Sequence, residues 1–211
     1  QDSGTSDGGA VYFVNGTQTG SIALSAADGR LLGDQSGGNA GAAVDFVGDI
    51  NEDGYADLMV GAPSGLTGGG GAAYLVYGPY SGDESLADAE GILLGTGSQE
   101  QVGYAVASAG DVDADGSTDL LVGAPTVDGS ARDSGVALLF YGGWTGTVEV
   151  GDQSDRFEGD VANAQVGTSF LGGLDLDSDG YGDLLLGASK ASVSGTSSVG
   201  EVYVYLGGLG Y

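Results

Sequence analysis

The hydrophobic residues of the chain are gathered in short runs, separated by glycines and polar residues. Runs of about four to eight residues favour β-strands, because amphipathic helices need longer periodic stretches. One kind of run is apolar at nearly every position and occurs three times, at residues 58–63, 120–125 and 184–189. An uninterrupted apolar run of this kind predicts a strand that is covered on both faces.

Three other kinds of run accompany it in a fixed order. A glycine-rich run precedes it, at residues 41–48, 103–110 and 167–174. A run that alternates aromatic and aliphatic residues and ends on glycine follows it, at residues 11–16, 73–78, 137–142 and 202–207. The fourth kind is weaker and predicts a solvent-facing edge strand, at residues 22–25, 91–95 and 148–151, the last continuing to residue 159.

Four antiparallel strands in 62 to 64 residues, repeated in tandem, predict blades of a β-propeller. We therefore expect an all-β chain of about three blades, with strands three and four first, then two complete blades, then strands one to three. Residues 1–8 are expected to form an N-terminal tail and residues 9–211 the propeller segment. Closed propellers have about four to eight blades. The ring is therefore expected to be incomplete, as part of a longer protein, or completed by homo-oligomerisation through the unfinished blades.

Between the first two strands of each repeat lies an acidic loop, at residues 49–57, 111–119 and 175–183. Oxygen-bearing side chains occupy loop positions 1, 3, 5 and 9, and a glycine at position 6 permits a sharp turn. Hard oxygen ligands in that number favour Ca²⁺, about three ions in all, over Mg²⁺ or transition metals. The expected ligands are Asp49, Asn51, Asp53, Tyr55, Asp57, Asp111, Asp113, Asp115, Ser117, Asp119, Asp175, Asp177, Asp179, Tyr181 and Asp183.

An EF-hand loop is the main alternative, because its first six positions look the same. It requires a bidentate glutamate at position 12, where this chain has Val60, Val122 and Leu186 inside apolar runs. The position-9 aspartates are instead expected to close the site, and the position-7 residues to contribute backbone carbonyls. Metal-free acidic turns are a second alternative, disfavoured because three or four clustered carboxylates repel one another without a cation.

The order of a glycine-rich run, an Asp-x-Asp/Asn-x-Asp-Gly-x-x-Asp loop and a Leu-x-Val-Gly-Ala-Pro strand resembles the FG-GAP repeat of integrin α-chain β-propellers. The resemblance covers residues 9 to 207. The Phe-Gly dipeptide is absent as such, and the third copy ends in Gly-Ala-Ser. The resemblance implies that calcium holds the scaffold, and that partners bind loops on the face opposite the calcium hairpins. In this chain those loops include residues 64–71, 126–134 and 190–199.

The chain carries 4 Lys and Arg against 30 Asp and Glu, a formal charge of −26, which argues against nucleic acid and anionic membrane surfaces as partners. Three bound calcium ions would reduce this charge to about −20. Loops of this type are mostly empty at cytosolic calcium levels, so an extracellular, secreted or cell-surface location is expected. The absence of cysteine decides nothing about compartment, and no apolar run is long enough for a membrane span. The first residue is not Met, so a mature or excised segment is expected.

We expect a calcium-stabilised, non-catalytic extracellular binding or adhesion module whose protein or glycan ligand is unknown. The chain has no His or Cys for catalysis, and nothing singles out Glu149 or Glu158 as a carboxylate pair. Two alternatives remain open. One is a self-associating structural surface protein, and the other is a lectin-like propeller that uses aromatic hairpin tips at Tyr80 and Trp144, with Leu209 at the equivalent place.

Overall fold

The computed structural model describes residues 7–14, 16–17, 19–65 and 69–208. These residues form fifteen β-strands and two short 3₁₀ helices, and none of them is α-helical. The strands are β1 (Ala10–Phe13), β2 (Gly29–Leu32), β3 (Ala43–Gly48), β4 (Asp57–Ala62), β5 (Ala72–Val76), β6 (Gly82–Ser85), β7 (Gly91–Leu94), β8 (Val106–Gly110), β9 (Asp119–Ala124), β10 (Val136–Phe140), β11 (Gly146–Glu149), β12 (Asp155–Glu158), β13 (Val166–Leu174), β14 (Asp183–Ala188) and β15 (Glu201–Tyr205). The helices are η1 (Leu24–Ala26) and η2 (Leu86–Asp88). Among the described residues, no helix has the length and hydrophobicity needed to cross a membrane.

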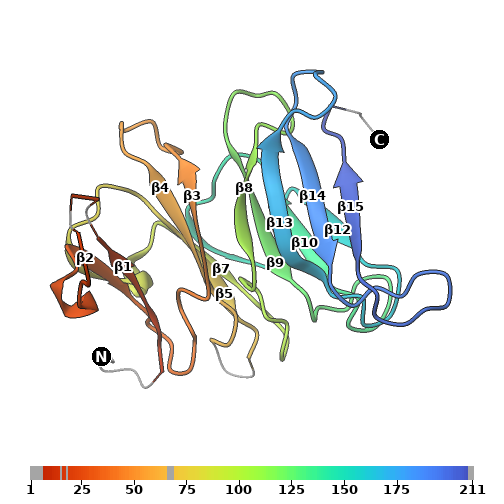
Figure 1. Ribbon diagram of the computed structural model, residues 1–211, viewed down its shortest axis with the longest axis horizontal. Helices are drawn as coiled ribbons and strands as arrows, with labels where there is room; N and C mark the ends of the chain where they lie inside the picture. The colour runs from red at the N-terminus through yellow and green to blue at the C-terminus, as the bar shows by residue number, and fades with distance from the viewer. Residues whose placement is uncertain (1–6, 15, 18, 66–68, 209–211) are drawn as a thin grey trace.

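Four sheets stand side by side and fan out along the molecule (Figure 1). We number them in chain order. The first sheet has the strand order β1-β2-β6, the second β11-β7-β5-β4-β3, the third β12-β10-β9-β8 and the fourth β13-β14-β15. Four consecutive strands of the second sheet (β7-β5-β4-β3) and all four strands of the third sheet pair antiparallel with their neighbours, as expected for a propeller blade. The predicted all-β propeller architecture is confirmed, and the ring is not closed.

The first three kinds of apolar run form the strands that the sequence predicts. The fourth kind is correct only at residues 91–95, which contain β7. Residues 22–25 overlap η1, and the fourth strand of that blade is β2. Residues 148–151 overlap β11, and the fourth strand of the third sheet is β12, within the predicted continuation to residue 159. The prediction at residues 22–25 was wrong, and the one at residues 148–159 was correct only in its continuation. β2 and β12 are short outer strands that each carry an arginine, so their own pattern is weak.

Two parallel strand pairs join neighbouring blades. After the third strand of its blade, the chain runs back along the outer strand of the preceding sheet before it forms its own fourth strand. β6 pairs in this way with β2, and β11 pairs with β7. Both segments are polar and four residues long, so their strand conformation depends on the neighbouring sheet. The sequence pattern did not predict these connections.

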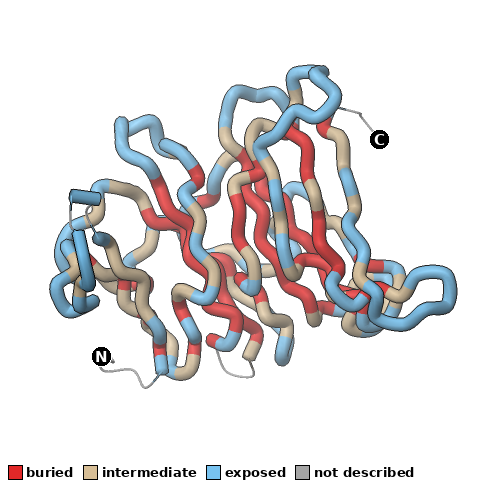
Figure 2. Tube along the Cα trace, viewed as in Figure 1, coloured by how far each residue is buried: buried red, intermediate tan, exposed pale blue. Residues whose placement is uncertain are grey.

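The hydrophobic core lies in the spaces between sheets, and Figure 2 shows buried residues along the central strands. β4 and β9 are buried at all six positions, as expected for strands covered on both faces. β4 and β9 each contain one glycine, Gly61 and Gly123, because a larger residue would clash with the next sheet. An added Cβ on Gly61 would lie 2.0 Å from the carbonyl oxygen of Gly103, and one on Gly123 would lie 2.0 Å from that of Gly167. The sheets therefore approach at glycine, which sets the close packing of one blade on the next.

Candidate metal-binding loops

The three acidic loops connect the first two strands of three consecutive blades. They join β3 to β4, β8 to β9 and β13 to β14, and they project from the same end of the sheets, at the top of Figure 1. Each second strand is a buried central strand held by neighbours on both sides. The loops are thus mounted on strands that are buried and paired on both sides.

Backbone amides organise the first carboxylate of each loop in the same way. Asp49 accepts a hydrogen bond from the amide of Asp53 at 3.0 Å on Oδ1 and from that of Gly54 at 2.8 Å on Oδ2. Asp111 and Asp175 accept the equivalent pairs, at 3.0 and 3.0 Å and at 3.1 and 3.1 Å. These bonds draw the loop around the first carboxylate, so the side chains at positions 1, 3 and 5 converge.

The turn also depends on two residues with positive φ. Position 4 adopts the left-handed conformation at Glu52, Ala114 and Ser178, with φ of 60°, 58° and 66°. Position 6 is glycine in all three loops, with φ of 93°, 92° and 95°. An added Cβ at any of these three glycines would meet nothing within 4 Å. Glycine is therefore required there by backbone conformation and not by space.

The aspartate at position 9 is fully buried in each loop: Asp57, Asp119 and Asp183 have 0% exposure. Two backbone amides bind the Asp119 carboxylate, from Val112 at 2.7 Å and from Gly142 at 2.8 Å. Asp57 and Asp183 accept the equivalent pairs from Ile50 with Gly78 and from Leu176 with Gly207. This carboxylate therefore ties the loop to the end of the third strand, a structural role that the sequence pattern did not reveal. Each oxygen retains a second lone pair that can face a cation.

Two of the loops bring three carboxylates close enough to share one ion. Asp111, Asp113 and Asp115 form one such group, and Asp175, Asp177 and Asp183 form another, with ligand oxygens all within 4.8 Å. The first loop differs because Asn51 occupies position 3 and donates a hydrogen bond from Nδ2 to Asp53 at 2.9 Å. Its ring of carboxylates is correspondingly less charged.

At position 7, the amides of Tyr55, Ser117 and Tyr181 each donate to the position-5 carboxylate, at 2.9, 2.7 and 3.0 Å. These bonds hold the position-5 carboxylates of Asp53, Asp115 and Asp179 toward the loop interior. Expected ligation by the position-7 carbonyls stays a prediction.

Electrostatics in these loops favour a cation. Burial raises the pKa of Asp119 despite the two amide hydrogen bonds, and the charges of Asp113 and Asp115 raise it further. Desolvation raises the pKa of Asp177, and Asp179 and other loop carboxylates add to the effect. A bound divalent ion would relieve this repulsion. A donor set made only of oxygens, with repeated carboxylates, fits calcium.

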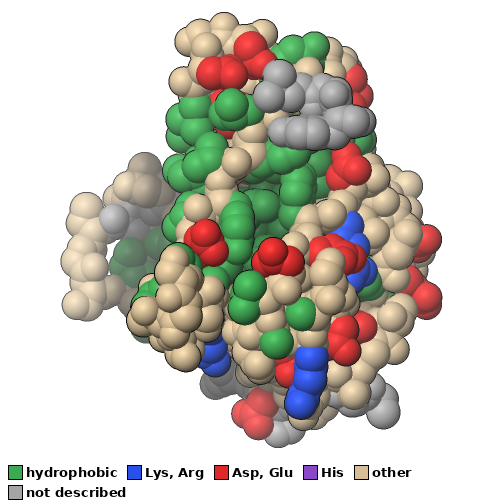
Figure 3. All heavy atoms as spheres, turned by 90° about the vertical axis from the view of Figure 1, so that its right-hand side faces the viewer, with side chains coloured by type: hydrophobic (Ala, Val, Ile, Leu, Met, Phe, Trp, Pro, Cys, Tyr) green, Lys and Arg blue, Asp and Glu red, His purple; other side chains and the backbone are tan. Residues whose placement is uncertain are grey.

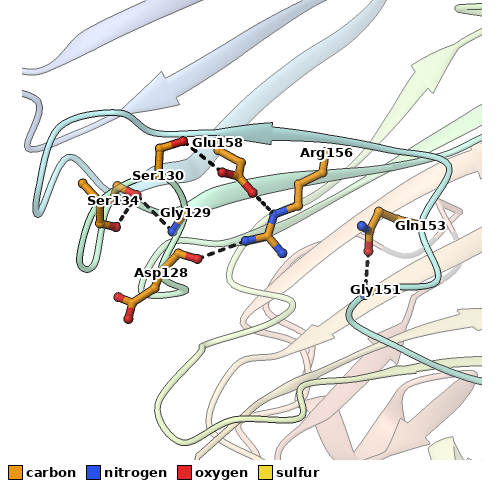
Figure 4. Close-up of polar contacts among 9 residues, drawn as sticks. Asp128, Gly129, Ser130, Ser134, Gly151, Gln153, Arg156 and Glu158 are labelled. Atoms are coloured by element: carbon orange, nitrogen blue, oxygen red, sulfur yellow. Dashed lines mark hydrogen bonds and ion pairs between the residues drawn. The ribbon is translucent and has the colours of Figure 1, made fainter.

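The opposite face of the sheets carries the loops between second and third strands. A hollow of about 430 Å³ lies on this face, lined by residues of three loops including Ser64, Gln99 and Thr126. The loop after β9 is well anchored (Figure 4). Arg156 of β12 donates to the carbonyl of Asp128 at 3.0 Å, and Glu158 accepts from Ser130 at 3.0 Å. Glu158 thus helps to hold the loop after β9 in place. The expected loop at residues 64–71 lies partly outside the described residues.

Two aromatic residues considered as exposed hairpin tips are packed between blades. Trp144 is 7% exposed and lies 4.6 Å from the ring of Phe140. Tyr80 stacks on Phe13 at 4.4 Å and donates to the carbonyls of Ala56 at 2.9 Å and Val76 at 3.1 Å. The exposed-aromatic hypothesis is therefore wrong for Trp144 and Tyr80, because both tips fold back onto the preceding blade. Leu209 lies outside the described residues.

Comparison with known proteins identifies the repeats. The family model described as FG-GAP repeat matches residues 37–76, 102–140 and 166–205. The chain is similar to integrin alpha-5 of Xenopus laevis, with 33% identity over 188 residues, covering 85% of this chain and 17% of the relative. It is also similar to integrin alpha-IIb of Mus musculus, with 32% identity over 204 residues, covering 88% and 19%. The chain thus spans less than a fifth of the length of these relatives.

Proposed function

Because the chain belongs to the FG-GAP repeat family, we propose that it is a calcium-stabilised binding module of the integrin-α-like propeller type, acting outside the cell. Its adhesion role rests on similarity to integrin α chains. The ligand is a protein or a glycan of a partner surface, bound without catalysis.

One observation carries the calcium part of the proposal. Three loops, 62 and 64 residues apart, repeat the same hydrogen bonds, the same two positive-φ positions and the same buried closing aspartate. A catalytic metal is usually unique in a protein, whereas a repeated site has a structural use. The proposed ligands are the fifteen residues at positions 1, 3, 5, 7 and 9 of the three loops.

Calcium would act on folding through the position-9 aspartate. In each blade this carboxylate already links the loop to the third strand, so an ion bound to it connects the first three strands of the blade. An ion that binds only the folded chain adds its binding energy to the stability of the fold. The remaining negative charge keeps the surface soluble and is compatible with the calcium-rich extracellular space.

The partner surface is proposed to lie on the face opposite the calcium loops. The hollow lined by Ser64, Gln99 and Thr126 is on that face, and the anchored loop of residues 126–134 borders it. Loops held on a rigid scaffold are the common location of binding residues. The chain contains no His or Cys, which agrees with a binding role.

Thermal unfolding in calcium and in EGTA tests the proposal. When free calcium exceeds Kd about a hundredfold, each site contributes about 2.7 kcal/mol. At about 2 °C per kcal/mol for a chain of this size, one site raises the melting temperature by about 5 °C and three sites by about 15 °C. Magnesium in place of calcium serves as the control and is expected to restore little of the shift. Equal melting temperatures in calcium and EGTA would contradict the proposal.

Binding to a partner is tested separately. The calcium-loaded chain, immobilised on beads, is screened against a glycan array and a panel of extracellular matrix proteins. We expect at least one ligand, whose binding is weakened by substitutions in residues 126–134 and unaffected by a substitution on the calcium face. Absence of binding in both screens would count against the adhesion role and leave the calcium result standing.

A further inference from the structure

A backbone hydrogen bond joins two of the three acidic loops. The amide of Gly182, at position 8 of the third loop, donates to the carbonyl of Asp111, at position 1 of the second loop, at 2.7 Å. Gly182 directly precedes the closing aspartate Asp183, and Asp111 carries the first carboxylate of its own loop. The bond therefore connects two blades at residues that are, or adjoin, proposed calcium ligands.

This close approach depends on the glycine at position 8 of the third loop. An added Cβ on Gly182 would lie 3.0 Å from the carbonyl oxygen of Ala109 and 3.2 Å from that of Asp111. Contacts at these distances are tight, so any larger residue would push the third loop away from the second. Gly182 is buried, whereas Thr118, at position 8 of the second loop, is partly exposed.

The first and second loops are not joined in this way. Within the described part of the chain, no hydrogen bond links the first loop to the second. The nearest atom to an added Cβ on Gly48, just before the first loop, would be Oγ1 of Thr118 at 3.6 Å. At the equivalent Gly110, the Cβ would lie 2.5 Å from a Cα of the fourth sheet. The second and third sheets are linked instead below the loops, where Asp45 accepts from the amide of Ser108 at 2.9 Å.

Buried contacts reinforce the link between the second and third loops. Val112, at position 2 of the second loop, is 3% exposed and shares a buried cluster with Leu184, the residue after Asp183. Gly207 donates to Asp183 at 2.9 Å, and an added Cβ on Gly207 would lie 3.1 Å from the carbonyl oxygen of Val112. The segment that closes the third loop therefore packs against the backbone of the second loop.

We propose that the second and third loops bind calcium cooperatively through this contact and that the first loop binds calcium independently, an inference that rests on the calcium function proposed above. When Asp183 is held by an ion, the adjacent amide of Gly182 is fixed, and the carbonyl of Asp111 is held in turn. A loop that is already ordered costs less to order when its own ion binds. The coupling is reciprocal, so each of the two loops strengthens the other by the same factor.

Electrostatic repulsion acts against this cooperativity. Figure 3 faces the fourth sheet and shows acidic side chains at its upper end, where the loops project, with the visible Lys and Arg side chains below them. Ions bound in neighbouring loops repel one another, but at about 0.15 M salt charges more than about 8 Å apart are largely screened. The same repulsion acts between the first and second loops. Comparison of the two neighbouring pairs therefore isolates the contribution of the contact at Gly182.

A calcium titration followed by nuclear magnetic resonance reads each loop separately. The amides of Gly54, Gly116 and Gly180 each donate to the position-1 carboxylate of their own loop, at 2.8, 3.0 and 3.1 Å. Their signals in a nitrogen–proton correlation spectrum therefore report the three loops one by one. The titration is run at about 0.15 M salt, where repulsion between the ions is weakest at physiological conditions.

Disabling one loop should weaken its coupled neighbour. Asp179→Asn removes a proposed ligand of the third loop and should raise the calcium midpoint of Gly116 by about two- to tenfold, the value of one net hydrogen bond. Asp115→Asn, in the second loop, should raise the midpoint of Gly180 by the same factor. Neither variant should raise the midpoint of Gly54. An unchanged midpoint of Gly116 in Asp179→Asn would overturn the proposal.

Gly182→Ala tests whether this contact carries the coupling. The φ of Gly182 is outside the left-handed region, so the backbone there tolerates alanine. In the Gly182→Ala background, Asp179→Asn should no longer raise the midpoint of Gly116. Thr118→Ala is the matched control at position 8 of the second loop, and the coupling should persist in its background.

The possible outcomes separate this inference from the calcium function itself. If the glycine signals move with calcium but the midpoints do not depend on the neighbouring loop, the loops bind calcium independently and the coupling is refuted. Coupling of equal size with and without Gly182→Ala would contradict the role of the contact with Asp111. If none of the three signals moves with calcium, the proposed calcium function fails, and the cooperativity fails with it.

Discussion

Replacing Asp119 with Asn separates the structural role of the closing aspartate from its proposed role in binding calcium. Asp119 is fully buried and its two oxygens accept hydrogen bonds from the amides of Val112 and Gly142 at 2.7 and 2.8 Å. Asparagine has one oxygen and one NH₂ group, so one backbone amide loses its acceptor and faces a donor. A buried unsatisfied donor costs about 1–3 kcal/mol. Removing the charge gives a partial gain, because burial and loop carboxylates raise the pKa of Asp119. We therefore expect a net loss of about 2 kcal/mol in the calcium-free chain.

The assay is urea unfolding in EGTA, followed by circular dichroism. Asp115→Asn is the matched control, because Asp115 is exposed. In the unmodified chain its Oδ1 accepts a hydrogen bond from the amide of Ser117 at 2.7 Å, and the side-chain oxygen of asparagine can accept the same bond. The control should unfold within about 0.5 kcal/mol of the unmodified chain. In saturating calcium both variants should be destabilised, since each loses a proposed ligand of the same ion.

The two variants are compared by their free energies of unfolding in EGTA. If Asp119→Asn unfolds in EGTA like the unmodified chain, the buried carboxylate does not connect loop and third strand as inferred. If Asp119→Asn and Asp115→Asn lose the same free energy of unfolding in EGTA, the charge of the loop determines the stability of the metal-free hairpin. The hydrogen bonds from the buried amides to Asp119 would then not determine it.

Three further predictions concern packing and pH. Gly123→Ala should destabilise the chain by about 1–3 kcal/mol in urea unfolding, because its Cβ would lie 2.0 Å from the carbonyl oxygen of Gly167, and an unchanged midpoint would contradict the close contact between blades. Trp144→Ala should cost about 3–5 kcal/mol in the same assay, and a smaller loss than 1 kcal/mol would show that this tip does not pack between blades. The pKa values of Asp119 and Asp177 are raised, so in the calcium-free folded state these carboxylates take up protons at a higher pH than ordinary aspartates do. Lowering the pH through their raised pKa values therefore stabilises the calcium-free fold. The same protons compete with calcium for the carboxylates. The difference in melting temperature between calcium and EGTA should therefore shrink as the pH falls from neutral toward about 4, and a constant difference would contradict carboxylate ligation.

Much of the blade could be predicted from the sequence. β4 and β9 are apolar after their first residue because blades cover both of their faces, and the acidic loops are conspicuous because oxygen ligands must recur at fixed positions. The outer strand β7 was located in this way, but β2 and β12 were not located closely. β2 and β12 carry Arg30 and Arg156 on partly solvated faces, so their strand conformation comes from pairing with the third strand.

Other features depend on tertiary contacts that no local pattern records. β6 and β11 are strands only because a preceding sheet offers an outer edge. The sequence pattern predicts that Trp144 lies at an exposed hairpin tip, but in the folded chain its ring packs against Phe140. The position-9 aspartates were expected as ligands, while their burial and their bonds to the third strand depend on where the strands end.

Calorimetric titration of calcium into the calcium-free chain tests the central claim most directly. The unmodified chain should bind three ions, and the Asp115→Asn variant should bind two, since the other loops keep their full set of proposed ligands. The absence of calcium binding, or an unchanged count in the variant, would contradict the claim that the three acidic loops are the calcium sites that hold these blades together.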